Sequence, residues 1–322
     1  MKAVIYEKYG TAENLELKEI GKPVPKEDEV LIKIHAVSIN DWDWQLLQGI
    51  PFINRIINGL FKPKIKILGS DVAGKIEAIG NDVKQFKLGD EVYGDLSNTW
   101  GGFAEYVCAK ENALALKPAG MTFGQAAAIP QAAMLAVQSL IDKGNIQDGQ
   151  KILINGAGGG VGTFGIQIAK QYDVEVTGVD NAEKLAMMKS LGFDYVIDYN
   201  KEDFTKSEYR YDLIIDTKTN RCVFEYVRAL NPNGIYASVG GSTTKLLSVI
   251  IFAPLIKMIL KKTMQLVVLK LNKDLAYINN LFKDGKIMPV LDEPYKLSEL
   301  PEAMRSFGEG RHKGKIIITV HS

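Results

Sequence analysis

A glycine-dense turn between an apolar strand and a helix is the segment of this chain with the clearest chemical use. Residues 151–162 read Lys-Ile-Leu-Ile-Asn-Gly-Ala-Gly-Gly-Gly-Val-Gly, and the run 163–170 that follows has a helical pattern. Glycine at 156, 159 and 162 allows a tight turn, close approach by a pyrophosphate and close packing of helix on sheet, while the N–H groups at the helix start favour the anion. A merely structural glycine loop is the alternative, and we predict dinucleotide binding.

The next strand ends in a carboxylate at the spacing that a dinucleotide site requires. The apolar run 174–179 leads into Asp180, 18 positions after Gly162. A carboxylate there can accept hydrogen bonds from an adenosine ribose and repels a 2′-phosphate, so Asp180 favours NAD(H) over NADP(H). A helix N-cap is the structural alternative for the same residue.

The bulk composition restricts the class of protein. The chain has 322 residues, of which 46% are hydrophobic and 24% charged, and this predicts two globular domains. The net charge is +1, so nothing attracts nucleic acid over long range. The two cysteines, Cys108 and Cys222, exclude a disulfide framework and a cysteine-rich zinc site. The first residues enter a strand pattern without a secretory signal, and we expect a cytoplasmic protein.

Strand and turn patterns divide the chain into a β-rich part and an alternating part. Residues 1–120 contain many short strands between glycine turns, which is typical of a barrel-like domain. Beyond this region strands and helices alternate, which predicts a parallel sheet covered by helices on both faces. The expected strands are 151–155, 174–179, 195–197, 212–216, 235–239 and 266–271, and the helices are 163–171, 182–191 and 221–230. A strand at 315–320 is expected to rejoin the N-terminal domain.

One strongly apolar segment does not fit a simple globular pattern. Residues 246–260 are almost entirely apolar, but Ser248, Pro254 and Lys257 interrupt them. The segment is too short and too broken to cross a bilayer as one helix, so we predict no integral membrane span. We expect a buried helix that walls an acceptor site, with peripheral membrane contact as the alternative.

Short motifs along the whole chain together resemble the medium-chain dehydrogenase/reductase superfamily, and most closely its zinc-independent quinone oxidoreductase branch. They are the opening Met-Lys-Ala-Val, Ser38-Ile39-Asn40 with Asp43, Gly-Ser-Asp-Val-Ala-Gly at 69–74, Gly-Asp-Glu-Val at 89–92, Gly-Phe-Ala-Glu-Tyr at 102–106, the glycine turn, and Gly-Lys-Ile-Ile-Ile at 314–318. The resemblance implies an α/β fold with a GroES-like β-rich catalytic domain, residues 1–124 and 272–322. It also implies a Rossmann domain with a doubly wound parallel sheet, residues 125–271, and a nicotinamide in the cleft between the domains.

The resemblance also bears on zinc. In the alcohol dehydrogenases of the superfamily a cysteine, a histidine and a later cysteine hold the catalytic metal. By motif position this chain has Asn40, Ser70 and Gln131 at those places. None of these is a good zinc ligand, because zinc prefers thiolate, imidazole or carboxylate. We therefore expect no metal site, and an acceptor that needs no Lewis acid.

Particular residues take catalytic and cofactor roles by resemblance. Asn40 is expected to hydrogen-bond a substrate carbonyl, and Asp43 to orient Asn40, the ribose or a water, although both could simply cap a turn. The expected cofactor-binding residues are Gly158, Gly159, Gly160, Val161, Asp180, Lys184, Tyr199, Thr217, Val239, Gly240 and Lys315. Lys184 and Tyr199 oppose the preference set by Asp180, because the family can use such residues near a 2′-phosphate.

The loop around Asn40 departs from the family pattern. Asp41 stands where the branch usually has proline, and Leu47 where it often has arginine, so the acceptor pocket is expected to be unusual. Lys315 has two open interpretations, a contact with the pyrophosphate and a place on a strand surface. No general acid is evident, and we expect water to supply the proton.

The expected activity is zinc-independent transfer of hydride from NAD(P)H to a small lipophilic quinone or α,β-unsaturated carbonyl compound. Two alternatives stay open: reduction of simple aldehydes or ketones, and a dinucleotide-binding regulatory protein with little catalysis. The edge strand 266–271 and the apolar segment beside it predict a homodimer, because exposed edges and apolar patches usually find partners.

Overall fold

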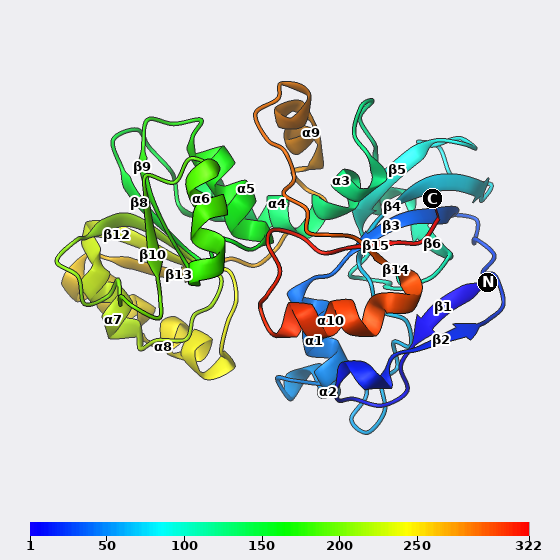
Figure 1. The fold of residues 1–322 in the computed structure, drawn as a ribbon, viewed down its shortest axis with the longest axis horizontal. Helices are drawn as coiled ribbons and strands as arrows, with labels where there is room; N and C mark the ends of the chain where they lie inside the picture. The colour runs from blue at the N-terminus through cyan, green and yellow to red at the C-terminus, as the bar shows by residue number, and fades with distance from the viewer. Residues whose placement is uncertain (322) are drawn as a thin grey trace. The chain divides into compact units, whose positions relative to one another are not determined.

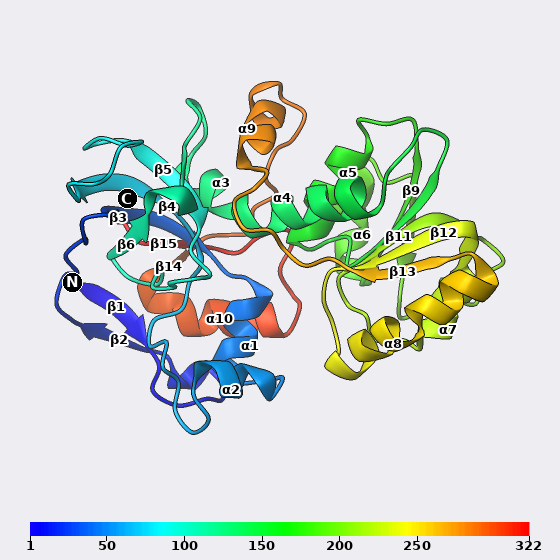
Figure 2. The same cartoon turned by 180° about the vertical axis from the view of Figure 1, so that it is seen from behind.

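The computed structural model describes residues 1–321, which form two compact units, each built around its own main sheet (Figures 1 and 2). The first unit comprises Met1–Gln131, Leu271–Asn279 and the chain from Pro289 onward, and the second comprises Ala132–Lys270 and Asn280–Met288. These bounds differ from the expected 1–124, 125–271 and 272–322. The first junction lies inside helix α4, Pro130–Val137, and Asn280–Met288 groups with the second unit.

The second unit contains a six-stranded parallel sheet in the order β10-β9-β8-β11-β12-β13. Its strands are β8 Lys151–Asn155, β9 Glu175–Asp180, β10 Tyr195–Asp198, β11 Tyr211–Asp216, β12 Leu230–Ser238 and β13 Thr263–Leu266. The chain order reverses between β8 and β11. The carboxyl ends of these two strands are therefore a topological switch point, the place where open α/β sheets bind nucleotides.

Helices connect these strands as the alternating pattern predicts. They are α5 Gly160–Ala169, α6 Leu185–Ser190 after a turn of 3₁₀ helix at Ala182–Lys184, α7 Val223–Ala229 and α8 Thr243–Leu260. The α/β fold with a Rossmann sheet is confirmed. The last strand, expected at 266–271, instead begins at Thr263, because α8 ends at Leu260 and the chain re-enters the sheet almost at once.

Helix α8 overturns the expectation for the apolar segment. Pro254 lies inside the helix without ending it, and only Val249 and Ile256 are buried, so the segment is neither broken nor buried. The buried stripe packs against α7, where Phe252 meets Phe224 with ring centroids 5.3 Å apart. Among residues 1–321, α8 is the one helix long and apolar enough to cross a bilayer by length and composition, and 11% of its 18-residue window is buried.

The first unit contains a seven-stranded, mainly antiparallel sheet and a separate two-stranded ribbon. The ribbon pairs β1 Lys2–Ile5 with β2 Glu16–Glu19, and the sheet contains β3 Glu29–Ser38, β4 Asp71–Ile79, β5 Glu91–Asp95, β6 Tyr106–Lys110, β7 Ala115–Leu116, β14 Tyr295–Lys296 and β15 Ile317–Thr319. Strand β15 pairs antiparallel with β3, with Ile318 opposite Val37. The C-terminal strand thus rejoins the N-terminal sheet, as expected.

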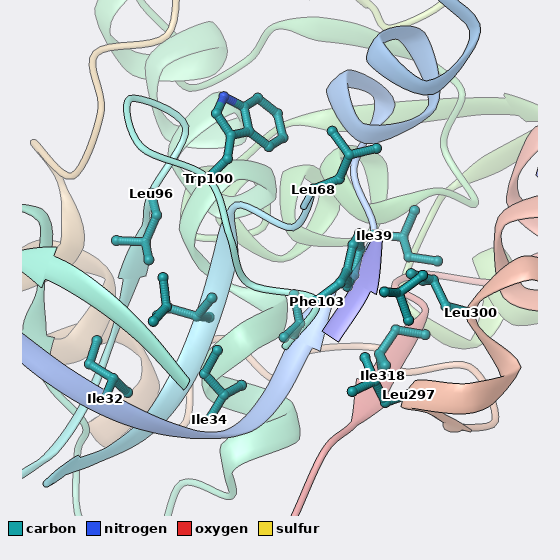
Figure 3. Packing of buried hydrophobic residues seen from close by; sticks show 14 of the residues in the cluster. Ile32, Ile34, Ile39, Leu68, Leu96, Trp100, Phe103, Leu297, Leu300 and Ile318 are labelled. Carbon is teal, nitrogen blue, oxygen red and sulfur yellow. The ribbon is translucent and has the colours of Figure 1, made fainter. Parts of the chain in front are cut away.

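Buried apolar side chains fix the central strand β3 of this sheet. Figure 3 shows Ile32 and Ile34 of β3 in one cluster with Phe103 and Leu300. Trp100 is buried in the same cluster. The helices of this unit are α1 Asp41–Gln48, α2 Ile53–Asn58, α3 Phe123–Ala128, α9 Leu275–Lys283 (shared between the units) and α10 Leu300–Gly308. This packing fixes the end of β3 and the start of β4, where polar residues are buried.

Candidate active site

The glycine turn follows β8 at the switch point and has no room for side chains. A Cβ atom at Gly156, whose φ is +83°, would lie 2.0 Å from Oγ1 of Thr217, and one at Gly162 would lie 2.4 Å from Cα of Ala157. Helix α5 begins at Gly160 with Gly159 as its N-cap. The N–H groups of Gly160 and Val161 belong to the first turn, where no intrahelical acceptor exists, and such groups bind anions. This cradle fits a pyrophosphate.

Asp180 ends β9 and its carboxylate braces the glycine turn. Oδ2 accepts the N–H of Gly158 at 2.9 Å, and Oδ1 accepts the N–H of Asn181 at 2.9 Å. The ammonium of Lys184 lies 3.5 Å from Oδ1, and both side chains are buried. The following 3₁₀ turn is capped by Asn181, whose side chain accepts the N–H of Glu183. The N-cap alternative for Asp180 is therefore wrong.

The other residues expected to bind the cofactor in this unit lie at the carboxyl edge of the same sheet. The N–H of Tyr199 donates to the carbonyl of Asp180 at 3.2 Å, and the Tyr199 side chain is 49% exposed. Oγ1 of Thr217 donates to the carbonyl of Asn155 at 3.0 Å. Val239, which precedes Gly240, donates its N–H to the carbonyl of the last residue of β11 at 2.8 Å. The sheet thus brings the ends of β8, β9, β11 and β12 together.

Asp216 at the end of β11 is an organising residue that the sequence interpretation missed. Its buried carboxylate accepts the side chain of Asn155 at 2.8 Å, the hydroxyl of Tyr236 at 2.8 Å, and the N–H groups of Lys218 and Thr219 at 2.8 and 3.0 Å. Such a network fixes the loop after β11 at the switch point. The sequence signal for this role was the acidic residue that directly follows the apolar run 213–215.

Asp43 of the first unit caps the turn that holds Asn40. Oδ2 accepts the N–H of Asn40 at 2.8 Å and Oδ1 accepts the N–H of Gly69 at 2.8 Å, and the carboxyl is fully buried. Burial raises the pKa of Asp43 to about 7, against the lowering effect of the two N–H donors. Its observed contacts are those of a turn cap that orients Asn40.

Asn40 and Lys315 form a buried pair from opposite ends of the chain. Nζ of Lys315 donates to Oδ1 of Asn40 at 2.6 Å and to the carbonyl of Ile39 at 3.0 Å. Nδ2 of Asn40 donates to Oγ of Ser70 at 3.2 Å. Burial lowers the pKa of Lys315, and nearby carboxylates, Asp71 first among them, oppose that change. Lys315 is thus not a strand-surface residue, and a role toward the cofactor stays a prediction.

Carboxylates surround this pair. Oδ2 of Asp71 lies 3.9 Å from Nζ of Lys315 and accepts the backbone N–H of Gln131 at 3.1 Å, while its Oδ1 is buried without a hydrogen-bond partner. Burial, and then the charge of Asp95, raise the pKa of Asp71. The three positions aligned with zinc ligands, Asn40, Ser70 and Gln131, do meet around this cluster. They offer an amide or a hydroxyl, and residues 1–321 contain no group of three or more His, Cys, Asp or Glu side chains placed to hold a metal.

The two units together define a class of protein. A Rossmann sheet with a pyrophosphate cradle at its switch point accompanies a GroES-like β unit that carries a buried polar cluster. This is the construction of a nucleotide-dependent dehydrogenase or reductase.

Comparison with known proteins supports that class and narrows it. Residues 26–119 match the family model described as alcohol dehydrogenase GroES-like domain, and residues 191–318 match the one described as zinc-binding dehydrogenase. The chain is 33% identical to the 2-methylene-furan-3-one reductase of Solanum lycopersicum over 99% of this chain and 79% of that one. It is 31% identical to the chloroplast envelope quinone oxidoreductase homolog of Arabidopsis thaliana over 99% of this chain and 98% of that one.

Solved structures agree with these relatives. The quinone oxidoreductase from Coxiella burnetii superposes with a TM-score of 0.86 at 28% sequence identity, covering 100% of this chain and 99% of that one. The chain belongs to the medium-chain dehydrogenase/reductase superfamily, in its zinc-independent quinone oxidoreductase branch.

Proposed function

We propose that this protein is a zinc-independent oxidoreductase that transfers hydride from NAD(P)H to a quinone or an α,β-unsaturated carbonyl compound. The observation that carries the proposal is the Asn40–Lys315 pair, whose Asn40 is one of the three positions aligned by motif with the zinc ligands of the alcohol dehydrogenases. An ammonium-supported amide polarises a carbonyl less than zinc does. Electron-poor acceptors need less polarisation of their carbonyl group. Relatives named quinone oxidoreductase homolog and alkenal/one oxidoreductase support this substrate class.

The glycine cradle holds the cofactor, which when bound supplies the hydride. In the first unit, Lys315 occupies the amide oxygen of Asn40 and Ser70 takes one of its two Nδ2 hydrogens. The second Nδ2 hydrogen is shared with the neighbouring Asp71 carboxyl, and we propose that it turns to the carbonyl oxygen of the acceptor when one is bound. For an enone, hydride adds to the β-carbon, the electron pair moves toward the oxygen, and a proton from water completes the saturated ketone. For a quinone, one hydride and one proton give the hydroquinone.

NADH is the proposed preferred cofactor. The carboxylate of Asp180 lies at the end of β9, where the adenosine ribose binds in Rossmann sheets, and its charge disfavours a 2′-phosphate. Lys184 is buried and engaged by Asp180, so a phosphate would have to compete for it. A relative at 31% identity is named NADPH-dependent, which makes cofactor choice a direct test of Asp180.

Assembly and compartment are part of the same proposal. Strand β13 pairs only with β12 and is the edge of its sheet, so two chains can pair there into a homodimer. Cys108 and Cys222 are free thiols, in keeping with the reducing cytoplasm that we expect.

The test is a panel of acceptors in a chelating buffer. The oxidation of NADH or NADPH with each acceptor is measured as the loss of the absorbance of the reduced cofactor. We expect turnover of quinones and enones and little turnover of saturated aldehydes and ketones. Turnover of saturated carbonyls alone would indicate an alcohol dehydrogenase-like reductase. Tight cofactor binding without turnover of any acceptor would indicate a regulatory protein.

A further inference from the structure

Helix α8 exposes apolar side chains around most of its surface. Ile251, Met258 and Ile259 are 60, 66 and 62% exposed, and Leu247, Ile250, Leu255 and Leu260 are exposed as well. A helix that is apolar all round is normally buried in a core or in lipid. Only Val249 and Ile256 are buried here, so the protein itself does not cover α8.

The segment of the chain that contains α8 carries one sign of charge. From residue 226 to residue 273 the chain contains no aspartate or glutamate, while Lys257 and Lys261 are exposed on the helix and at its end. Lys270 is exposed just after the edge strand β13. In a chain whose net charge is only +1, this segment is cationic.

A segment of the first unit repeats this composition. Phe52 before α2, Ile56 and Ile57 within it and Phe61 after it are exposed, Phe61 to 88%. The residues from 44 to 70 include no acid, and Lys62, Lys64 and Lys66 are exposed there. Of the large apolar residues that are exposed in this protein, many therefore lie in two acid-free, lysine-bearing segments.

We propose that α8 seats the protein on an anionic lipid surface; the α2 segment belongs to the other unit, and its similar composition makes it a separate lipid contact. Apolar side chains enter the boundary between headgroups and acyl chains, and the lysines pair with anionic headgroups. The homodimer proposed above pairs the edges of β13, and on the exposed face of α8 itself a second copy of the chain fits less well. In a symmetric dimer the same patch faces itself, which would bring Lys257 and Lys261 toward their own copies without a carboxylate.

The connections of α8 decide between lying on a membrane and crossing it. The helix joins β12 to β13, which are parallel neighbours in one sheet with Tyr236 opposite Met264. Its Val249 and Ile256 pack on that same unit. Crossing a bilayer would pull these strands apart, so α8 binds as an interfacial helix.

The experiment is co-sedimentation of the full chain with vesicles of pure phosphatidylcholine and of equimolar phosphatidylcholine and phosphatidylglycerol. We expect binding to the anionic vesicles that weakens with added salt. The double variant Ile251→Gln/Ile259→Gln should bind more than about tenfold more weakly. The double variant Lys257→Gln/Lys261→Gln should lose about fivefold for each lysine on anionic vesicles only.

Matched controls use equally exposed positions outside the two segments. Val24→Gln/Leu88→Gln and Lys201→Gln should bind as the unchanged protein does, and thermal unfolding by circular dichroism should show all variants folded. A wild-type chain that stays in the supernatant with both kinds of vesicle overturns the proposal. So do α8 variants that co-sediment with anionic vesicles as strongly as the wild type does. So does a wild-type dimer that Ile251→Gln/Ile259→Gln dissociates without any vesicle binding, because α8 is then an interface between copies.

Discussion

Lys315 and Ser70 hold the side chain of Asn40 from both ends of its amide, and the Asp71 carboxyl lies beside it. Asp43 holds the backbone of Asn40 and is fully buried. In the proposed function the amide of Asn40 is the donor to the acceptor, and Lys315, Ser70 and Asp43 position it. Such positioning changes the reaction rate by orders of magnitude when the reacting geometry depends on it.

A positioning role for Lys315 predicts coupled effects. Lys315→Met frees the amide of Asn40 to rotate, so kcat with an enone should fall by about 10 to 100-fold. The Asn40→Ala change should lower kcat by a similar factor, and the double variant should lower kcat by little more than either single change. Steady-state kinetics on the three variants measures this. Additive losses, or a loss confined to cofactor affinity in fluorescence titration, would assign Lys315 to the cofactor instead.

Asp180 predicts cofactor choice. Asp180→Asn keeps an acceptor for the N–H of Gly158 but removes the charge, so the preference for NADH over NADPH should fall by about tenfold, or ~1.4 kcal/mol. The exposed neighbour Glu183→Gln is the control and should change neither affinity. Fluorescence titrations that give the dissociation constants of NADH and NADPH measure this preference. A wild-type protein that already prefers NADPH strongly contradicts this interpretation of Asp180.

The buried carboxyls predict a pH dependence of stability. Burial raises the pKa of Asp43 to about 7 and also raises the pKa of Asp71. The folded state then holds protons that the unfolded state has lost, so the free energy of unfolding should decrease as pH rises from about 4 to 7. Urea titrations across this range measure it, and Asp71→Asn should flatten the decrease. An Asp71→Asn variant that keeps the wild-type pH dependence would show that Asp71 is ionised in the folded protein over this window.

At the scale of elements, local patterns predicted most of the architecture. The strand–turn–helix at 151–170 and the alternation after it predicted the Rossmann sheet, because each element is short and contiguous in sequence. The Asn40–Lys315 pair was not predictable from spacing, since the two residues are 275 positions apart and meet only through the pairing of β15 with β3. The exposure of α8 was also missed, because an apolar run looks the same whether the protein or another surface covers it.

The free edge of β13 predicts the state of assembly. Val267, just after the strand, donates its N–H inward to the carbonyl of Ser238, so by alternation the N–H of Leu266 faces outward. Proline is tolerated on such an edge but cannot donate to a partner strand. Leu266→Pro should therefore leave the fold intact and turn a homodimer into a monomer in analytical ultracentrifugation. A wild-type monomer at micromolar concentration contradicts the proposed pairing.

At the scale of the whole molecule, one unit carries a glycine turn at the switch point of its sheet, and the other carries the buried Asn40–Lys315 pair. Neither feature alone implies hydride transfer, since cradles also occur in regulatory proteins and capped asparagines occur in ordinary turns. The claim that both serve one reaction is the centre of this account, and the fate of the transferred hydrogen tests it.

The most direct measurement follows deuterium from the C4 position of the nicotinamide into the product. The protein is incubated with NADH deuterated at C4, in each of its two stereochemical forms, and a simple α,β-unsaturated ketone, and the product is analysed by NMR. We predict a saturated ketone with one deuterium at the β-carbon from one of the two forms. Deuterium at a carbinol carbon, or a ketone without deuterium from either form, would contradict hydride transfer to an electron-poor double bond.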